Sequence, residues 1–151
     1  MIEAKLHGIE ALTAKLSAVK FETRYRGGRF ALRKAAQVWR EAAKANAQRL
    51  DDPETGRSIA QNIAERWNAR LYKATGDLAF RVGVMGGARS QNNPDESAGA
   101  PTPHWRFFEF GTEKMAAQPF MQPAAEQNVQ SATDVFIAQY GKALDRALKK
   151  S

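Results

Sequence analysis

Apolar residues recur every three or four positions along three stretches of the chain, and this spacing predicts three amphipathic helices. The first covers residues 2–19, the second runs from about residue 30 to residue 50, and the third covers residues 121–149. The two glycines of "YRGGRF", residues 25–30, predict a break between the first two helices. The stripes expected to be buried are Leu32, Ala35, Ala36, Trp39, Ala43, Ala47 and Leu50 on the second helix, and Ala125, Val129, Ala132, Phe136, Tyr140, Leu144 and Leu148 on the third.

The middle of the chain predicts a short helix, a β-hairpin and a loop. Residues 58–67 place Ile59, Ile63 and Trp67 on one side of a helix. Residues 78–85 alternate as a strand does, and residues 69–74 are the expected partner strand across the "ATGD" turn. The Gly-, Ser-, Asn- and Pro-rich residues 86–103 predict a flexible loop.

These elements predict one α+β domain over residues 1–151, with helices packed on a small antiparallel β-sheet and a long C-terminal helix. Its expected parts are a mainly helical region at 1–67, a β-hairpin at 69–85, a flexible loop at 86–103, an aromatic segment at 104–120 and the last helix at 121–149.

The formal net charge of +7 is carried by the first third of the chain. Residues 1–50 hold 11 Lys and Arg against 4 Asp and Glu, whereas the charges of the remainder cancel. Arg33, Arg40 and Lys44 share the face of the second helix opposite its alanine stripe. Such a face predicts contact with DNA phosphates or with an acidic protein partner, and an ordinary solvated helix surface is the alternative interpretation.

The sequence carries none of the common catalytic or cofactor-binding motifs, such as HExxH, GxSxG or a P-loop. It has no cysteine, which excludes disulfides, thiolate metal sites and cysteine nucleophiles. His7 and His104 have no partner at a metal-ligand spacing, and Asp51, Asp52 and Glu54 form a cluster typical of a solvated turn. We therefore expect no enzymatic activity, no cofactor and no metal ion.

Aromatic residues are concentrated in "HWRFFEFGTEKMAAQPFMQPA", residues 104–124. A strand here would place Trp105 and Phe107 on one face and Phe108 and Phe110 on the other. Both faces would then need cover. The cover is either the rest of the chain, which makes the segment core, or a partner subunit, which makes it an interface.

The carboxylate of Glu109 lies among these aromatic residues. We expect it to pair with Arg106 or to accept hydrogen bonds from backbone donors at the Gly111 turn. No neighbouring motif supports a catalytic role for it.

The segment "FFEFGTEKMAAQPFMQPA", residues 107–124, resembles the signature F-x-E-F-G-T-x-x-M-x-A-Q-P-F-x-x-P-A of a tailed-phage family. This is the family of head–tail neck or tail-completion proteins (minor tail components), typified by the gene-ten product of phage HK-ninety-seven. The basic helix "ALRKAAQVWREAAKANA" and the turn Thr55-Gly56-Arg57 agree with the resemblance, and the order of elements matches over about residues 28–145.

The resemblance implies a structural protein of the virion of a long-tailed bacteriophage. Its members are expected to form a ring, six-fold or alternatively twelve-fold, at the head–tail junction around the DNA channel, in contact with other neck and tail proteins. Assembly is expected in the bacterial host cytoplasm, because the chain shows no secretory signal and no apolar run of the roughly 20 residues that span a bilayer. The alternative function is that of a sequence-nonspecific DNA-binding protein.

The resemblance also implies that the signature residues are packing and interface anchors, with Gly111 and Thr112 forming a turn that Glu109 ties down. The candidate anchors are Trp105, Phe107, Phe108, Glu109, Phe110, Gly111, Thr112, Met115, Gln118, Pro119, Phe120, Met121 and Pro123. Arg33, Arg40 and Lys44 remain the candidates for facing the DNA channel or an acidic ring.

Overall fold

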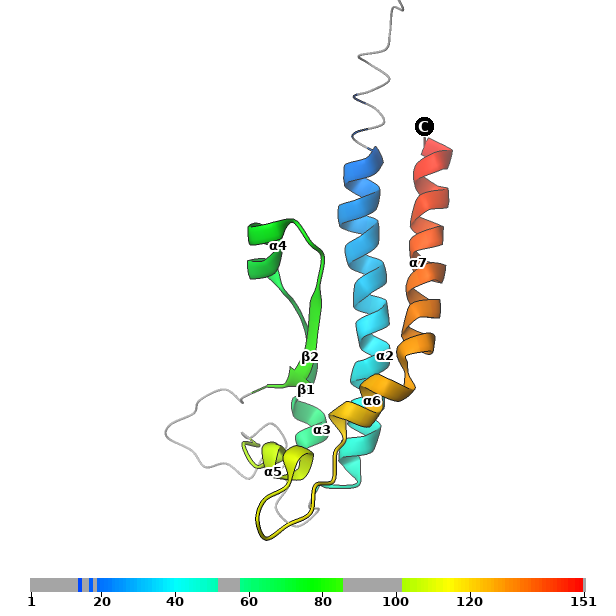
Figure 1. Ribbon diagram of the computed structural model, residues 1–151. Coiled ribbons are helices and arrows are strands. Elements are labelled where there is room, and N and C mark those ends of the chain that lie inside the picture. The colour runs from blue at the N-terminus through cyan, green and yellow to red at the C-terminus, as the bar shows by residue number, and fades with distance from the viewer. Residues whose placement is uncertain (1–13, 15–16, 18, 52–57, 86–101, 151) are drawn as a thin grey trace, which may run out of the picture.

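A computed structural model describes residues 14, 17, 19–51, 58–85 and 102–150 (Figure 1). Two long helices, α2 (Gly28–Gln48) and α7 (Val129–Lys150), run antiparallel side by side. An antiparallel sheet of two strands, β1 (Ile63–Trp67) and β2 (Phe80–Val84), packs on the other side of α2. The predicted α+β domain is confirmed, with α2 as the middle layer between the sheet and α7.

Shorter helices precede, connect and follow these elements. A π-helix, η1 (Glu22–Gly27), leads directly into α2. Helix α3 (Ile59–Asn62) precedes β1, and α4 (Ala69–Thr75) connects the two strands. Helix α5 (Trp105–Phe110) lies near α3, while α6 (Met121–Gln127) crosses α2 and leads into α7 (Figure 1).

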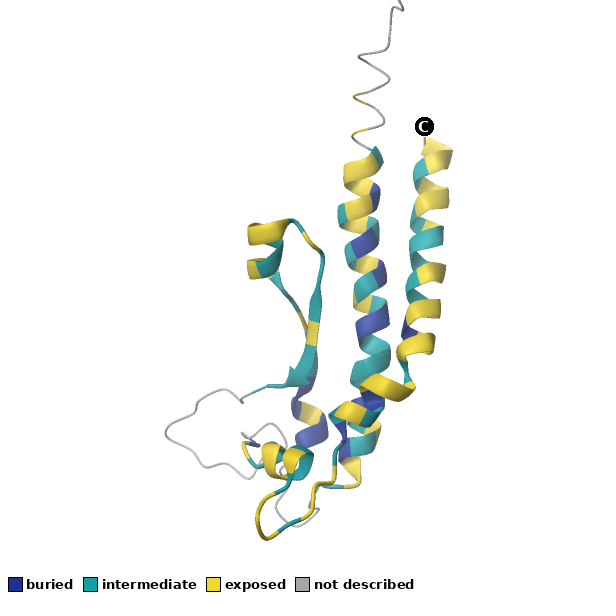
Figure 2. Ribbon diagram, in the orientation of Figure 1, coloured by how far each residue is buried: buried dark blue, intermediate teal, exposed yellow. Residues whose placement is uncertain are grey.

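The core lies where the C-terminal half of α2 meets α3, β1 and α6. Its buried members are Ala43, Ala47, Ile59, Ala60, Ile63, Phe120 and Ala124. The predicted alanine stripe of α2 is thus confirmed, because small side chains let three elements approach one helix. Figure 2 shows the contrast with α7, whose turns are largely exposed.

The glycines of "YRGGRF" do not break the helix, so that prediction was wrong. Gly27 and Gly28 both have helical φ and ψ and continue η1 into α2. A Cβ at Gly27 would lie 2.7 Å from the Cβ of Ala143, and one at Gly28 would lie 2.9 Å from Cδ1 of Leu78. These glycines therefore serve close packing of α7 and of the β2 lead-in against α2.

The predicted helix over 58–67 ends at Asn62, and residues 63–67 form a strand instead. Ile63 and Trp67 are four residues apart, which is one helical turn but also two pleats of a strand. The spacing therefore fits both structures. The strand has the additional effect of turning Glu65 toward α2, where Gln37 and Arg40 contact its carboxylate. These contacts favour the strand over the helix.

The expected partner strand at 69–74 was also wrong, because this segment is helix α4. The side-chain oxygen of Asn68 accepts a hydrogen bond from the backbone N–H of Leu71, and Gly76 ends the helix with φ +76°. An Asn before and a Gly after a short segment are recognised helix start and stop signals. They could have identified α4 from the sequence.

The last predicted helix is divided at Asn128 into α6 and α7. The buried side of α6 therefore differs from the prediction: Ala124 is buried, whereas Ala125, which was expected to be buried, is exposed. The predicted burial of Ala132 is confirmed, whereas Val129, Leu144 and Leu148 are 55%, 41% and 68% exposed, so their predicted burial was wrong. The predicted first helix over 2–19 falls almost wholly outside the described residues, as does most of the loop at 86–103.

Candidate assembly interface

The aromatic segment is a helix, α5, so its interpretation as a strand was wrong. The residues that face the core are one helical turn apart: Trp105 and Phe108 pack against buried residues. Phe107 and Phe110 point away and are 55% and 74% exposed. One side of helix α5 therefore belongs to the core and the other side to the surface.

Phe120 is the residue on which this region is anchored, with none of its surface exposed. The Trp105 ring meets it edge-on, with ring centroids 6.4 Å apart. The side-chain amide of Asn46 on α2 donates to the Phe120 carbonyl oxygen at 3.2 Å. The aromatic segment is thereby attached to the central helix by both apolar and polar contacts.

Glu109 binds the beginning of α6 rather than Arg106 or the Gly111 turn, so the predicted partners were wrong. Its Oε2 accepts hydrogen bonds from the backbone N–H groups of Phe120 and Met121 at 2.9 and 3.0 Å. Its Oε1 accepts one from Gln122 at 3.0 Å. A carboxylate satisfies the free N–H groups of a helix N-terminus and interacts favourably with the helix dipole. Glu109 thus joins α5 to α6.

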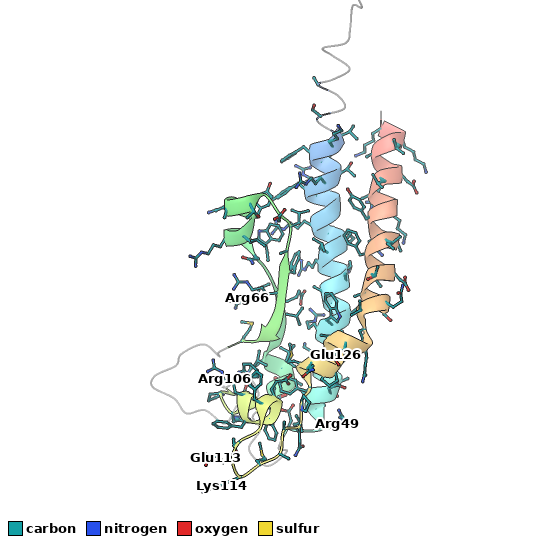
Figure 3. The ribbon with its side chains drawn as sticks, in the orientation of Figure 1. Arg49, Arg66, Arg106, Glu113, Lys114 and Glu126 are labelled. Carbon is teal, nitrogen blue, oxygen red and sulfur yellow. The ribbon has the colours of Figure 1, made fainter. Side chains whose placement is uncertain are left out.

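The predicted turn after the aromatic residues is present. Gly111 ends α5 with φ +73°, a left-handed conformation that glycine adopts without strain. Thr112 and Met115 then exchange backbone hydrogen bonds, and the Thr112 hydroxyl accepts from the backbone N–H groups of Lys114 and Met115. Figure 3 shows Glu113 and Lys114 at the tip, pointing away from the molecule.

The other signature residues divide between packing and surface. Met121 packs against the core, and Met115, Pro119 and Pro123 are half-buried. Gln118 is exposed, and its backbone N–H donates to the Phe108 carbonyl oxygen at 2.7 Å. The structure therefore brings the signature together around Phe120, with its exposed members on α5 and the turn.

Helix α7 presents a second apolar surface, and three of its four residues, Val129, Leu144 and Leu148, had been expected in the core. Val129, Ile137, Leu144 and Leu148 are between 41% and 68% exposed. At about 100° per residue, their spacing places all four within about 100° of the helix circumference. This set of four residues is called the α7 stripe below.

The basic face of α2 is turned toward β1, where it meets Glu65. Arg40 Nη1 lies 2.6 Å from Glu65 Oε2, and Arg33 Nε lies 3.4 Å from Oε1, which also accepts from Gln37 at 3.2 Å. The Glu65 side chain is only 5% exposed. Contact of Arg33, Arg40 and Lys44 with DNA or an acidic ring stays a prediction, but two of these three residues are engaged within the chain.

Two opposing effects set the protonation of Glu65. Burial alone would raise the pKa of its carboxyl group, but hydrogen bonds from Gln37, from its own backbone and from Arg40, together with the Arg40 charge, lower that pKa to about 2. Burial likewise opposes the charge of Arg40, yet Glu41 and Glu65 raise its pKa above the usual value. Sequence reasoning missed Glu65, whose only signal was an acidic residue on the inward side of an alternating segment.

Asp51, part of the acidic cluster, is used as a helix cap. Its carboxylate accepts hydrogen bonds from the N–H of Ile59 at 2.6 Å and from the Ser58 hydroxyl at 2.8 Å. The rest of the cluster, Asp52 and Glu54, lies outside the described residues. Within the described part of the chain, no group of three or more His, Cys, Asp or Glu could hold a metal ion, and no helix could cross a membrane.

One comparison with known proteins is decisive. The family model described as "Bacteriophage HK97-gp10, putative tail-component" matches residues 10–111, about two thirds of the chain. The chain belongs to this phage tail-component family. The match includes α2, the sheet and α5, and it ends at Gly111, so the turn, α6 and α7 lie beyond it. Neither a curated protein nor a solved structure matches the chain significantly.

Membership of this family indicates the general function of the protein. As a phage tail component, the protein has a structural role in the virion and interacts with other tail proteins. Helices α5 and α7 both carry exposed large apolar residues.

Proposed function

We propose that this tail component forms a ring at the head–tail junction of a long-tailed phage, around the channel through which DNA passes. Its role there is structural rather than catalytic. The ring is expected to hold six subunits, with twelve as the alternative. Membership of the tail-component family supports a structural role, and the uncovered apolar surfaces support assembly with further subunits.

The α7 stripe is the observation that carries this proposal. It consists of four large aliphatic side chains on α7, the helix that lies on the side of α2 remote from the sheet. Apolar surface that a chain leaves uncovered typically marks a protein interface. Burying these side chains in an assembly would be favourable by about 25 cal/mol per Å² of apolar surface removed from water.

A second uncovered surface favours a ring over a simple dimer. Phe107 and Phe110 belong to α5, which lies near α3 at one end of the molecule, away from most of α7. Two different apolar surfaces on one subunit suit a heterologous contact, in which one surface of a subunit meets another surface of its neighbour. Such contacts produce a closed ring when the rotation between subunits closes.

Substitution of one stripe residue tests the proposal. Ile137→Asp should leave the monomer folded, because the side chain is 62% exposed, but should prevent rings from forming. The matched control is Ala138→Asp, the next residue of α7, which is also exposed and points about 100° away. Sedimentation velocity and negative-stain microscopy measure assembly, and circular dichroism melting measures folding.

The same experiment separates the two functions considered from the sequence. Rings of wild type and of Ala138→Asp, in solution or in purified tails, with none from Ile137→Asp, would support the ring. A wild-type protein that binds duplex DNA as a monomer and is absent as a ring from tails would contradict it. That second result would favour a free, sequence-nonspecific DNA-binding protein.

A further inference from the structure

The sheet has an outward face that carries two arginines and otherwise only small residues. The β1–β2 register pairs Arg66 with Arg81 and Ala64 with Gly83. These residues alternate with Glu65 and Val82, whose side of the sheet faces α2, so they point the opposite way. Figure 3 shows the Arg66 side chain extending away from α2.

The Arg66–Arg81 pair is unfavourable within the chain. Side chains directly opposite each other in an antiparallel pair lie about 5 Å apart at Cβ, and like charges there destabilise the sheet. Among the described residues, no carboxylate lies within ion-pair distance of either arginine. Arg81 donates to the neutral side-chain oxygen of Asn68 at 3.0 Å. Among the described contacts, none therefore neutralises the charge of these two arginines.

Gly83 is similarly unexplained by folding. It does not have a positive φ, and within the described part of the chain nothing lies within 4 Å of a Cβ built on it. Glycine weakens a strand, and in strand interiors it often marks a place where a ligand or another backbone approaches closely. Gly83 and Ala64 leave a low surface beside the two arginines, open to such an approach.

Helix α4, which connects the two strands, adds two further cations to the hairpin. Arg70 and Lys73 are both exposed and are three residues apart, so they are neighbours on the helix surface. Over residues 63–85 the acidic residues are Glu65, which is turned inward to Arg40, and Asp77. Arg66, Arg70, Lys73 and Arg81 are called the hairpin basic face below.

We propose that the hairpin basic face binds the phosphate backbone of double-stranded DNA. Arginine presents a planar fork of donors that matches phosphate oxygens, and neutralised phosphates release counterions, which favours binding. Contacts to phosphate carry no sequence information, so this binding is independent of sequence. Positions where local rules of folding are broken are often functional.

The chemistry of the face distinguishes duplex DNA from two other partners. Single-stranded nucleic acid is bound by stacking bases on aromatic rings, but Trp67 and Phe80 pack together on the inward side, where Arg29 lies over Trp67. Arginine occurs at protein interfaces too, but there it is combined with aromatic anchors in a dry centre, and the outward face of the sheet offers only Ala64 and Gly83 beside its arginines. A set of cations without an apolar anchor suits a phosphate backbone.

This inference concerns a surface of each subunit and does not require a ring. It relocates the DNA contact from the α2 face, where Arg33 and Arg40 already contact Glu65, to the hairpin. DNA binding and ring formation are measured separately, so failure of one leaves the other intact.

The test compares two double variants of the full chain that remove the same charge. Arg66→Gln with Arg81→Gln alters the hairpin basic face, and Arg33→Gln with Lys44→Gln alters the α2 face. Fluorescence anisotropy measures binding to a labelled duplex of about 30 base pairs between about 50 and 200 mM salt. A single strand of the same length and polyglutamate serve as alternative ligands.

The hairpin variant should bind the duplex at least about tenfold more weakly, and its plot of log K against log salt should be shallower by about two units. The α2 variant should bind as wild type does. The melting temperature of the hairpin variant should be equal or higher, because a like-charge pair is removed. Equal binding by the hairpin variant, loss in the α2 variant instead, or tighter binding of wild type to the single strand or to polyglutamate would overturn the proposal.

Discussion

Arg40 on α2 and Glu65 on β1 form a salt bridge of 2.6 Å across the interface between the central helix and the sheet. The carboxylate is almost fully buried, and Gln37 and Arg33 also contact it. The rest of this interface includes aliphatic side chains such as Ile63, Val82 and Val84, and Arg29 lies over the Trp67 ring. The pair therefore fixes which side of β1 faces α2, since a shift of one residue would expose Glu65 and bury Arg66.

The first prediction concerns acid stability. The folded protein holds the pKa of Glu65 at about 2, below its ordinary value of 4.5. A carboxyl group whose pKa is lower in the folded state stabilises the fold at pH values above its unfolded-state pKa. This stabilisation is lost as the pH falls toward the folded-state pKa. Stability should therefore decrease by about 3 kcal/mol between about pH 5 and pH 2 on account of this group. Urea denaturation measured across that range would show the change.

Removing the charge tests the same interaction at neutral pH. Glu65→Gln should destabilise the protein by roughly 3 kcal/mol at pH 7, because Arg40 loses a buried partner, and should flatten the acid dependence. Glu41→Gln is the matched control. Its 2.6 Å bridge to Arg40 is 61% exposed on the carboxylate side, so its loss should cost less than about 1 kcal/mol. Equal effects of the two variants would show that burial does not govern this pair.

The third prediction concerns the link between α5 and α6. Glu109→Ala removes the acceptor for three backbone N–H groups and should cost roughly 1–3 kcal/mol in unfolding free energy. Glu113→Ala, at the exposed tip of the turn, should change stability by less than about 0.5 kcal/mol. Denaturant titration of both variants measures the difference. A Glu109 variant as stable as wild type would mean that water replaces the carboxylate without cost.

Two glycines in helices should respond in opposite ways to alanine. Gly27→Ala should destabilise the protein by about 1 kcal/mol or more, because the new Cβ would lie 2.7 Å from Ala143 and overpacking outweighs the gain in helix propensity. Gly141→Ala should stabilise by about 0.5–1 kcal/mol, because nothing in the described chain lies within 4 Å of that Cβ. Thermal melting distinguishes the two, and stabilisation of both would refute the close packing of η1 against α7.

The fifth prediction separates core from surface within the aromatic signature. Phe120→Ala should cost roughly 3–5 kcal/mol, since this side chain is fully buried. Phe110→Ala should change monomer stability by less than about 1 kcal/mol, because the ring is 74% exposed, and should instead weaken assembly. Denaturation and sedimentation velocity are measured on the same samples. A large loss of monomer stability for Phe110→Ala would contradict its assignment to a surface.

The local pattern was informative wherever the apolar residues of an element follow a single period. The alanine stripe of α2 and the alternation of β2 were predicted because apolar residues recur there with the period of a helix and of a strand. The turn at Gly111 and Thr112 was predicted for a local reason too, since glycine tolerates a left-handed backbone. The family signature also follows from the order of residues alone.

The remaining features depend on contacts between distant segments. Residues 63–67 and 105–110 fit more than one period. Their side chains pack against segments outside their own local sequence, α2 in the first case and Phe120 in the second. The partners of Glu109 are 11 to 13 residues further along the chain.

The charge of the chain shows the same division most clearly. The sequence by itself determined the net charge of +7 and concentrated it in the first third, along a predicted helix. Only the tertiary structure decided which cations remain available: Glu65 holds Arg40 and contacts Arg33, whereas strand pairing leaves Arg66 and Arg81 facing outward. The reason is that side chains of opposite charge meet through folding across a helix–sheet interface, and their separation in sequence does not reveal it.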